Sequence, residues 1–372
     1  MSDPEPGADR LAAPGRLAGV DLARGLAVLG MFAAHLLDLP ELDWNRPATL
    51  PGLATGHASV LFALLAGVSL ALVGTASRTD RGNRLRLACR ALVIWALGLA
   101  VVGTGVPVEV ILPAYGLLFL VATGLLGRSV TTLLQVATVL GLLGPPLVLA
   151  LDEWLWPRIP DGGAWQDRLG WAYPAPVWAC YLAGGMAVGL LLRHPARRTP
   201  KALAELAVAG ALLAVLGHAL LGTLAGLATA TDRRPGSPAW WLRALDDAPH
   251  SDGIGEVVAS SGLALLTLAA CLLLCRTPMA LLAWPLRAVG SMPLTAYVAH
   301  LLAWAGWLHL NPTGEAEAVA AFRALHPFWP TVALTLAACS LWTALLGRGP
   351  LEQLVRVLSG RLAGVVERPT TT

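Results

Sequence analysis

The first apolar run of the chain, residues 17–37, reads LAGVDLARGLAVLGMFAAHLL. It is long enough to cross the hydrocarbon core of a bilayer as a helix, which takes roughly 20 residues. Three ionisable residues interrupt it: Asp21, Arg24 and His35. At about 100° of rotation per residue, their side chains share one face of the helix. Because charged groups inside a membrane helix are costly and usually mark a pathway or a reactive site, we expect the chemistry of the protein here.

Nine further apolar runs predict a polytopic membrane protein. Only 13% of the residues are charged and 56% are hydrophobic, which is far from the composition of a soluble protein. The nine runs cover about residues 57–76, 88–105, 107–127, 130–151, 173–192, 203–228, 254–275, 287–309 and 328–346. We therefore predict an all-α, polytopic integral membrane helical bundle of about ten transmembrane helices.

The basic residues predict the orientation of this bundle. Two clusters fall in loops on one side: Arg78, Arg81, Arg84, Arg86 and Arg90, and Arg193, Arg197, Arg198 and Lys201. Most acidic residues fall in the loops on the other side. Since loops rich in Lys and Arg stay in the cytoplasm, we predict that both chain ends are cytoplasmic (N-in, C-in) and that the protein is a multi-pass protein of the cell membrane.

Three segments are expected along the chain. Residues 1–15, rich in Pro, Gly and Asp, are predicted to form a disordered cytoplasmic N-terminus. Residues 16–348 form the bundle. Residues 349–372 alternate leucines with Arg356 and Arg361, a pattern typical of an amphipathic cytoplasmic tail lying on membrane lipids. The net charge of +3 belongs to loops facing an anionic leaflet, so we expect no nucleic-acid binding.

Several reaction classes have no support in the sequence. The chain lacks the G-x-x-x-x-G-K-[ST], H-E-x-x-H and G-x-S-x-G motifs of ATPases, zincins and serine hydrolases. Cys271 and Cys275 lie one helical turn apart, but no His or carboxylate stands near them in the sequence. We therefore interpret both cysteines as small residues that pack in the bundle, and we predict no bound metal.

Three motifs resemble those of a known group of membrane proteins. They are Arg16-x-x-Gly19-Val20-Asp21-x-x-Arg24-Gly25-Leu26-Ala27, Val289-Gly290-Ser291-Met292-Pro293-Leu294-Thr295-Ala296-Tyr297 and Arg348-Gly349-Pro350-Leu351-Glu352. The first resembles the opening of the YeiB-like (DUF418) proteins and of the heparan-alpha-glucosaminide N-acetyltransferase family. Arg24-Gly25 followed by His35 is also similar to the first helix of acyltransferase family 3. The other two motifs strengthen the YeiB-like match.

The resemblance implies a transmembrane acyltransferase. Such an enzyme takes an acyl group, with acetyl as a candidate, from cytoplasmic acyl-CoA and passes it to an extracytoplasmic glycan, lipid or amine. Acyl-CoA is thus the implied co-substrate, a surface glycan or lipid the implied partner, and a homodimer one open oligomeric state. YeiB-like and heparan-type members often have asparagine at the position of His35, and heparan-type members place a histidine soon afterwards. The next histidine here is His57, so the catalytic role could belong to His35 or to His57.

Each candidate on the first helix has two interpretations. His35 could act as a general base or carry the acyl group, or it could tie helices together by hydrogen bonds. Arg24 could offer a planar fork to donor phosphate with Asp21 holding it in place, or the two could form an ion pair that locks the helix into the bundle. The predicted inner loop with Arg84, Arg86 and Arg90 could guide the anionic donor or contact anionic lipids.

The acceptor side has its own candidates. Tyr297, His300 and Trp304 share one face of the predicted ninth span and could line a substrate channel, or they could pack in the interior. Seven tryptophans lie in or beside the predicted outer loops: Trp44, Trp154, Trp156, Trp165, Trp171, Trp240 and Trp241. They could form a docking surface for a sugar or an ordinary interfacial belt.

A rival function uses the same residues without catalysis. A permease for a small polar or anionic solute could use Asp21, Arg24 and His35 as a binding or proton-relay site. Solute flux without any acyl donor would favour the permease, and stabilisation by acyl-CoA would favour the enzyme.

Overall fold

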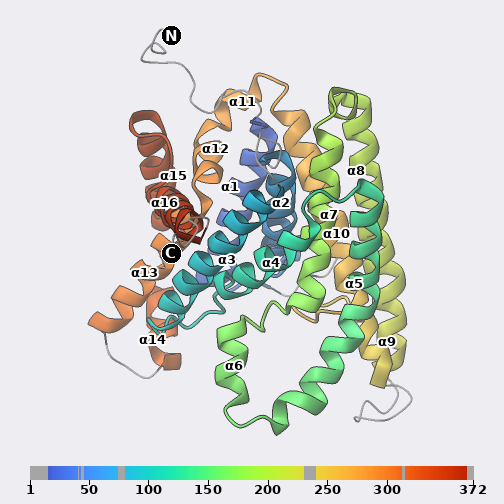
Figure 1. Ribbon diagram of the computed structural model, residues 1–372. Coiled ribbons are helices and arrows are strands. Elements are labelled where there is room, and N and C mark those ends of the chain that lie inside the picture. Colours follow the sequence, from blue (N-terminus) through green and yellow to red (C-terminus); the bar gives the residue numbers. More distant parts are fainter. Residues whose placement is uncertain are drawn as a thin grey trace, which may run out of the picture. The chain divides into compact units, whose positions relative to one another are not determined.

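The computed structural model describes residues 16–40, 42, 46–73, 80–229, 240–311 and 315–366, and their regular structure is helical (Figure 1). The α-helices are α1 (Ala18–Leu36), α2 (His57–Val73), α3 (Asp80–Val102), α4 (Leu112–Leu125), α5 (Val130–Ala150), α6 (Gly162–Leu169), α7 (Ala175–Leu192), α8 (Pro200–Val215), α9 (Thr223–Thr229), α10 (Ile254–Leu274), α11 (Met279–Leu282), α12 (Trp284–Ser291), α13 (Pro293–Leu310), α14 (Glu315–Ala324), α15 (Phe328–Leu345) and α16 (Pro350–Val366). Shorter 3-10 and π-helical segments connect several of them.

The helices confirm a polytopic membrane fold. Among the described residues, seven helices are long and apolar enough to cross a membrane. Two helix pairs could each form a further crossing: residues 47–54 with α2, bent by 47°, and α12 with α13, bent by 83°. Helix α4 is apolar but only 14 residues long, about 21 Å at 1.5 Å per residue. All ten predicted runs contain helix, and among the described residues seven helices, or nine counting each bent pair as one span, have the length and composition of a membrane crossing.

The chain divides into two compact units, which are described separately. Unit 1 comprises Met1–Ala58 and Thr267–Leu354, and unit 2 comprises Ser59–Leu266 and Val355–Thr372. The expected boundaries at residues 15 and 348 stay predictions. Residues 1–15, whose disorder we expected, lie outside the described residues, and so do Arg78 and Trp44.

Unit 1 is organised around a close crossing of α1 and α12. A Cβ atom added to Gly290 would lie 1.7 Å from the carbonyl oxygen of Asp21, and one added to Gly25 would lie 2.1 Å from the carbonyl oxygen of Leu286. The two backbones therefore touch, and only glycine fits at either position. Helix α15 packs against α12, where Ser291 Oγ lies 3.4 Å from Thr343 Oγ1. The first two motifs quoted above thus pack on one another.

Unit 2 contains the α3–α4 and α5–α7 pairs. Its helices also approach through glycines. A Cβ atom added to Gly185 on α7 would lie 2.0 Å from the carbonyl oxygen of Leu64 on α2, and one added to Gly189 would lie 2.6 Å from that of Val68. Backbone contact between α7 and α2 is therefore possible because these two residues have no side chain.

The segment before α10 in unit 2 is held by buried carboxyl groups. Glu256, 2% exposed, accepts hydrogen bonds from the backbone N–H groups of His250 and Asp252. The Asp252 carboxyl in turn accepts a hydrogen bond from Trp178 Nε1 at 3.0 Å. Burial, and then the nearby Glu256, hold the pKa of Asp252 well above its usual value, against the hydrogen bond from Trp178.

This raised pKa predicts a pH-dependent stability. The folded carboxyl keeps its proton where the unfolded one ionises, so its burial destabilises the fold as pH rises above about 4. We expect Asp252→Asn to remove this loss of stability at high pH, because asparagine does not ionise. Asparagine also keeps an acceptor for Trp178 and tolerates the positive φ of 52°. We compare the difference in melting temperature, variant minus parent, at two pH values. This difference should be larger at pH 7.5 than at pH 4.5 by roughly 3 °C or more. The control is Asp161→Asn at an exposed position, for which we expect the same difference in melting temperature at both pH values. The same result for Asp252→Asn would contradict the raised pKa of Asp252.

Candidate functional site

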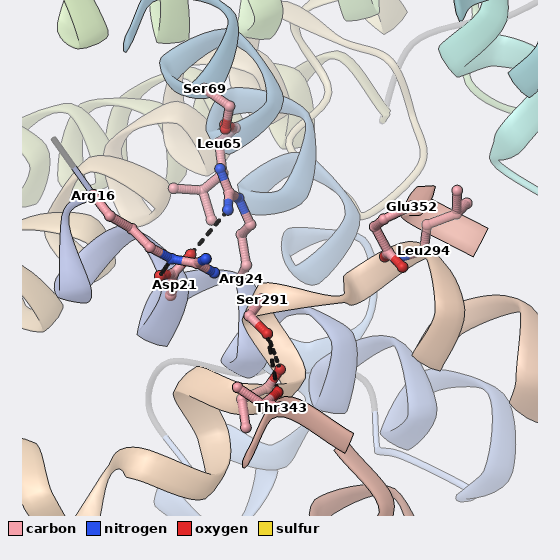
Figure 2. Close-up of polar contacts among 10 residues, drawn as sticks. Arg16, Asp21, Arg24, Leu65, Ser69, Ser291, Leu294, Thr343 and Glu352 are labelled. Atoms are coloured by element: carbon pink, nitrogen blue, oxygen red, sulfur yellow. Dashed lines mark hydrogen bonds and ion pairs between the residues drawn. The ribbon is translucent and has the colours of Figure 1, made fainter. Parts of the chain in front are cut away.

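The polar face of α1 begins with one buried carboxylate between two guanidinium groups. Asp21 is 2% exposed. It pairs with Arg16 Nε, and its Oδ1 accepts a hydrogen bond from Arg24 Nη1 at 3.0 Å (Figure 2). Two guanidinium groups therefore share this one carboxylate. Asp21 also lies in the first helical turn, where the helix dipole favours an acid.

The other end of α1 brings two histidines together. His35 Nδ1 lies 3.0 Å from His300 Nε2 of α13, and the two rings stack at 5.3 Å between centroids. One nitrogen must donate and the other accept, so the two rings share one proton along this contact. His35 is half-buried, whereas His300 is 5% exposed. His35 is therefore the more exposed ring of the pair.

Neighbouring side chains fix the orientation of both rings. Phe32 packs against His300 with 4.3 Å between ring centroids, and Tyr297 lies 5.2 Å from His300 and 6.3 Å from His35. Arg323 Nη2 of α14 donates to the carbonyl oxygen of His35 at 3.3 Å. A cation at this position also satisfies a carbonyl group in the last turn of α1, where the helix dipole is negative.

The remaining candidates of unit 1 are His57 and Trp304. His57 begins α2, as the sequence indicated, and is 8% exposed. Trp304 is 1% exposed and stacks on Phe322 of α14 at 5.2 Å. Of the predicted substrate residues, Tyr297 and His300 thus lie at His35, whereas Trp304 packs on the next helix. Which of them binds substrate stays a prediction.

The prediction that the basic stretch forms a loop is wrong, because this stretch is helical. Arg84, Arg86 and Arg90 lie on α3, which begins at Asp80, well before the apolar run. Arginine and leucine are good helix formers, so the helix extends through this basic stretch. Arg84 Nη2 donates to the carbonyl oxygen of Leu126 at 3.2 Å, and Arg90 lies 5.5 Å from the Phe119 ring. All belong to unit 2, and their role toward a donor stays a prediction.

The tryptophans of the predicted outer loops belong to unit 2 where they are described. Trp154, Trp165 and Trp241 are about half exposed, at 50%, 48% and 50%. Trp171 Nε1 donates to Asp152 at 2.6 Å and its ring lies 4.9 Å from that of Trp156. The guanidinium group of Arg168 lies over the Trp165 ring at 5.1 Å. The role of these rings in docking a sugar stays a prediction.

Three interactions escaped the sequence interpretation. Arg323 holds the end of α1, Glu352 contacts the start of α13, and Asp247 pairs with His218 at 2.8 Å. Each joins residues far apart in the chain, which helical periodicity does not reveal. Among the described residues, no group of three or more His, Cys, Asp or Glu side chains is placed to hold a metal ion.

Comparison with known proteins identifies the family. A family model described as heparan-alpha-glucosaminide N-acetyltransferase, catalytic, matches residues 16–223, which is more than half of the chain. A second, described as a protein of unknown function (DUF418), matches residues 218–361. A search of curated proteins found no match. The first match contains α1 with Asp21, Arg24 and His35, and the second contains α12, α13 and Glu352. The chain belongs to the heparan-alpha-glucosaminide N-acetyltransferase family and is a YeiB-like (DUF418) membrane protein.

Proposed function

We propose that this protein transfers an acyl group, acetyl in the first instance, from acyl-CoA on the cytoplasmic side of the cell membrane to the amino or hydroxyl group of a glycan on the outer side. The family is one of acetyltransferases, which supports the reaction class. The name of the family supports an amino sugar as the acceptor. The His35–His300 contact is the observation that carries the proposal.

The histidine pair suits general base catalysis. His35 Nδ1 faces His300, so we assign the base to His35 Nε2. In that tautomer Nδ1 carries the proton and donates a hydrogen bond to His300 Nε2, which fixes the ring and leaves the lone pair of Nε2 to accept a proton. Nε2 takes a proton from the acceptor as its nitrogen or oxygen attacks the thioester carbonyl carbon. The C–S bond then breaks, the acyl group stays on the acceptor, and the CoA thiolate receives the proton.

The spacing along α1 suits the donor. Arg24 and His35 are separated by 11 positions, which corresponds to about 16 Å along a helix. The pantetheine arm between the pyrophosphate and the thioester of CoA has a comparable length. A donor with its phosphates at Arg24 would therefore present its carbonyl group near His35. Asp21 keeps Arg16 as a second partner, so Arg24 can turn toward a phosphate while the buried carboxylate stays paired.

Replacement of Arg24 tests both the donor and its placement. We expect Arg24→Gln to raise KM for acetyl-CoA by about 10-fold or more, because a charged hydrogen bond contributes about 1.5–3 kcal/mol. The value of kcat should change little, since the contact is remote from the reacting atoms. Steady-state transfer from labelled acetyl-CoA to glucosamine by purified protein measures both constants.

A truncated donor supplies the control for this experiment. S-acetylpantetheine carries the thioester but lacks the nucleotide phosphates, so its KM should be the same in the parent and in Arg24→Gln. An equal loss with both donors would show that Arg24 supports the fold and does not bind phosphate. Absence of transfer by the parent from either donor, together with donor-independent uptake of a solute into proteoliposomes, would replace the enzyme by the rival permease.

A further inference from the structure

The start of α13 depends on a residue from the last helix. A helix begins with backbone N–H groups that have no partner inside the helix. Pro293 has no N–H group. The next two N–H groups, those of Leu294 and Thr295, donate to Glu352 Oε1 at 2.8 and 3.1 Å. Figure 2 shows Leu294 beside Glu352. The Thr295 hydroxyl donates to Glu352 Oε2 at 2.5 Å. One carboxylate of α16 therefore accepts both early backbone donors of α13.

The contact is reciprocal. Helix α16 begins with Pro350, which also lacks an N–H group, and the N–H group of Leu351 donates to Thr295 Oγ1 at 3.1 Å. Thr295 thus caps α16 while Glu352 caps α13. A Cβ atom added to Gly349 would lie 2.1 Å from Glu352 Oε2 and 2.5 Å from Met292 Cβ, so glycine is required for this approach. The third sequence motif, Arg348 to Glu352, is built around this double cap.

The double cap lies where α13 needs an external support. Helices α12 and α13 meet at an angle of 83°, and the bend interrupts the backbone hydrogen bonds that would otherwise set the direction of α13. His300 follows Pro293 by seven positions, about 10 Å along the helix. A tilt of ~6° at the cap would therefore move the His300 ring by about 1 Å, and displacements of this size at a catalytic group reduce rates by about 100-fold.

We propose that Glu352 is a positioning residue that aims α13, so that His300 holds His35 in the orientation needed for proton abstraction. Its catalytic consequence rests on the proposed function, whereas the capping itself does not. Glu352 contacts neither histidine and acts through the first two turns of α13. The carboxylate is suited to this role because it has enough acceptor sites for two N–H groups and one hydroxyl.

Hydrogen exchange and kinetics on the full-length protein separate these two parts. We expect Glu352→Ala to increase amide exchange in peptides covering residues 293–301, and to lower kcat per folded molecule by ~10- to 100-fold with KM for acetyl-CoA unchanged. Glu352→Gln keeps one acceptor oxygen and should recover part of both losses. The control on the same helix is Arg361→Ala, at an exposed position of α16, which should leave exchange and kcat at parental values.

Each alternative result has a definite meaning. Unchanged exchange at residues 293–301 in Glu352→Ala would overturn the cap, and increased exchange with unchanged kcat would overturn the positioning role. If the parent shows no transfer, the proposed function has failed, and the exchange data still decide the cap. Should Glu352→Ala fail to fold, Thr295→Val removes only the shared hydroxyl. It should show the same two effects at smaller size, and parental values in that variant would reject the inference.

Discussion

His35→Ala should lower acyl transfer by at least ~100-fold, because general base catalysis contributes a factor of about 100 to 10,000. The rate is compared per folded molecule, because loss of the ring also removes the partner of His300 Nε2. The effect is measured as the rate of label transfer from acetyl-CoA to glucosamine, divided by the concentration of monodisperse protein. His57→Ala is the matched variant, because His57 is the alternative base and is also at a helix end.

His35→Asn refines the test. Removal of the ring leaves buried His300 Nε2 without its partner, which costs about 1–3 kcal/mol. Asparagine supplies a donor N–H group to His300 but no base, so His35→Asn should fold like the parent and remain inactive. Activity in His35→Asn with loss of activity in His57→Ala would assign the chemistry to His57 and refute the role of the histidine pair.

Gly290→Ala should prevent unit 1 from forming its α1–α12 crossing. The added methyl group would lie 1.7 Å from the Asp21 carbonyl oxygen and 2.7 Å from Gly25 N, and backbone atoms cannot yield as a flexible side chain would. Separating two packed helices costs more than ~3 kcal/mol, a large part of a total stability of about 5–15 kcal/mol. We expect aggregated protein in size-exclusion chromatography, or a melting temperature far below that of the parent.

Gly306→Ala is the control for this substitution. Gly306 lies on α13 in the same unit, and no atom would lie within 4 Å of its added Cβ. Alanine stabilises a helix by up to about 1 kcal/mol relative to glycine, so this variant should match or exceed the parent. A monodisperse Gly290→Ala protein with parental melting temperature would show that the crossing is not formed as described.

Much of the fold was predictable because apolar runs of bilayer length have few alternatives to helix. The run at 17–37 became α1, Ala18–Leu36, and its polar residues share one face as the helical period requires. The run at 287–309 was expected as one span, but it breaks between Ser291 and Pro293 into two helices at 83°. Pro293 was the available signal, since proline starts helices more readily than it continues them.

The sequence named candidate residues for the site but could not predict which of them lie together. His35 and His300 were each named as candidates because ionisable groups are rare in spans, yet their contact joins positions 265 residues apart. No periodicity relates such positions in a single sequence. Glu352 was part of a recognised motif without a role, because the cap it forms on α13 depends on how α16 folds back.

The most direct test of the account follows the acyl group across a membrane. Proteoliposomes containing the purified protein and trapped labelled acetyl-CoA are given glucosamine on the outside, and the outer medium is analysed for labelled N-acetylglucosamine. We expect that the labelled product accumulates outside, that intact acetyl-CoA does not escape, and that His35→Asn abolishes the signal. Product formation that persists in His35→Asn would contradict the central role of this imidazole, and so would glucosamine entering the vesicles without any acyl transfer.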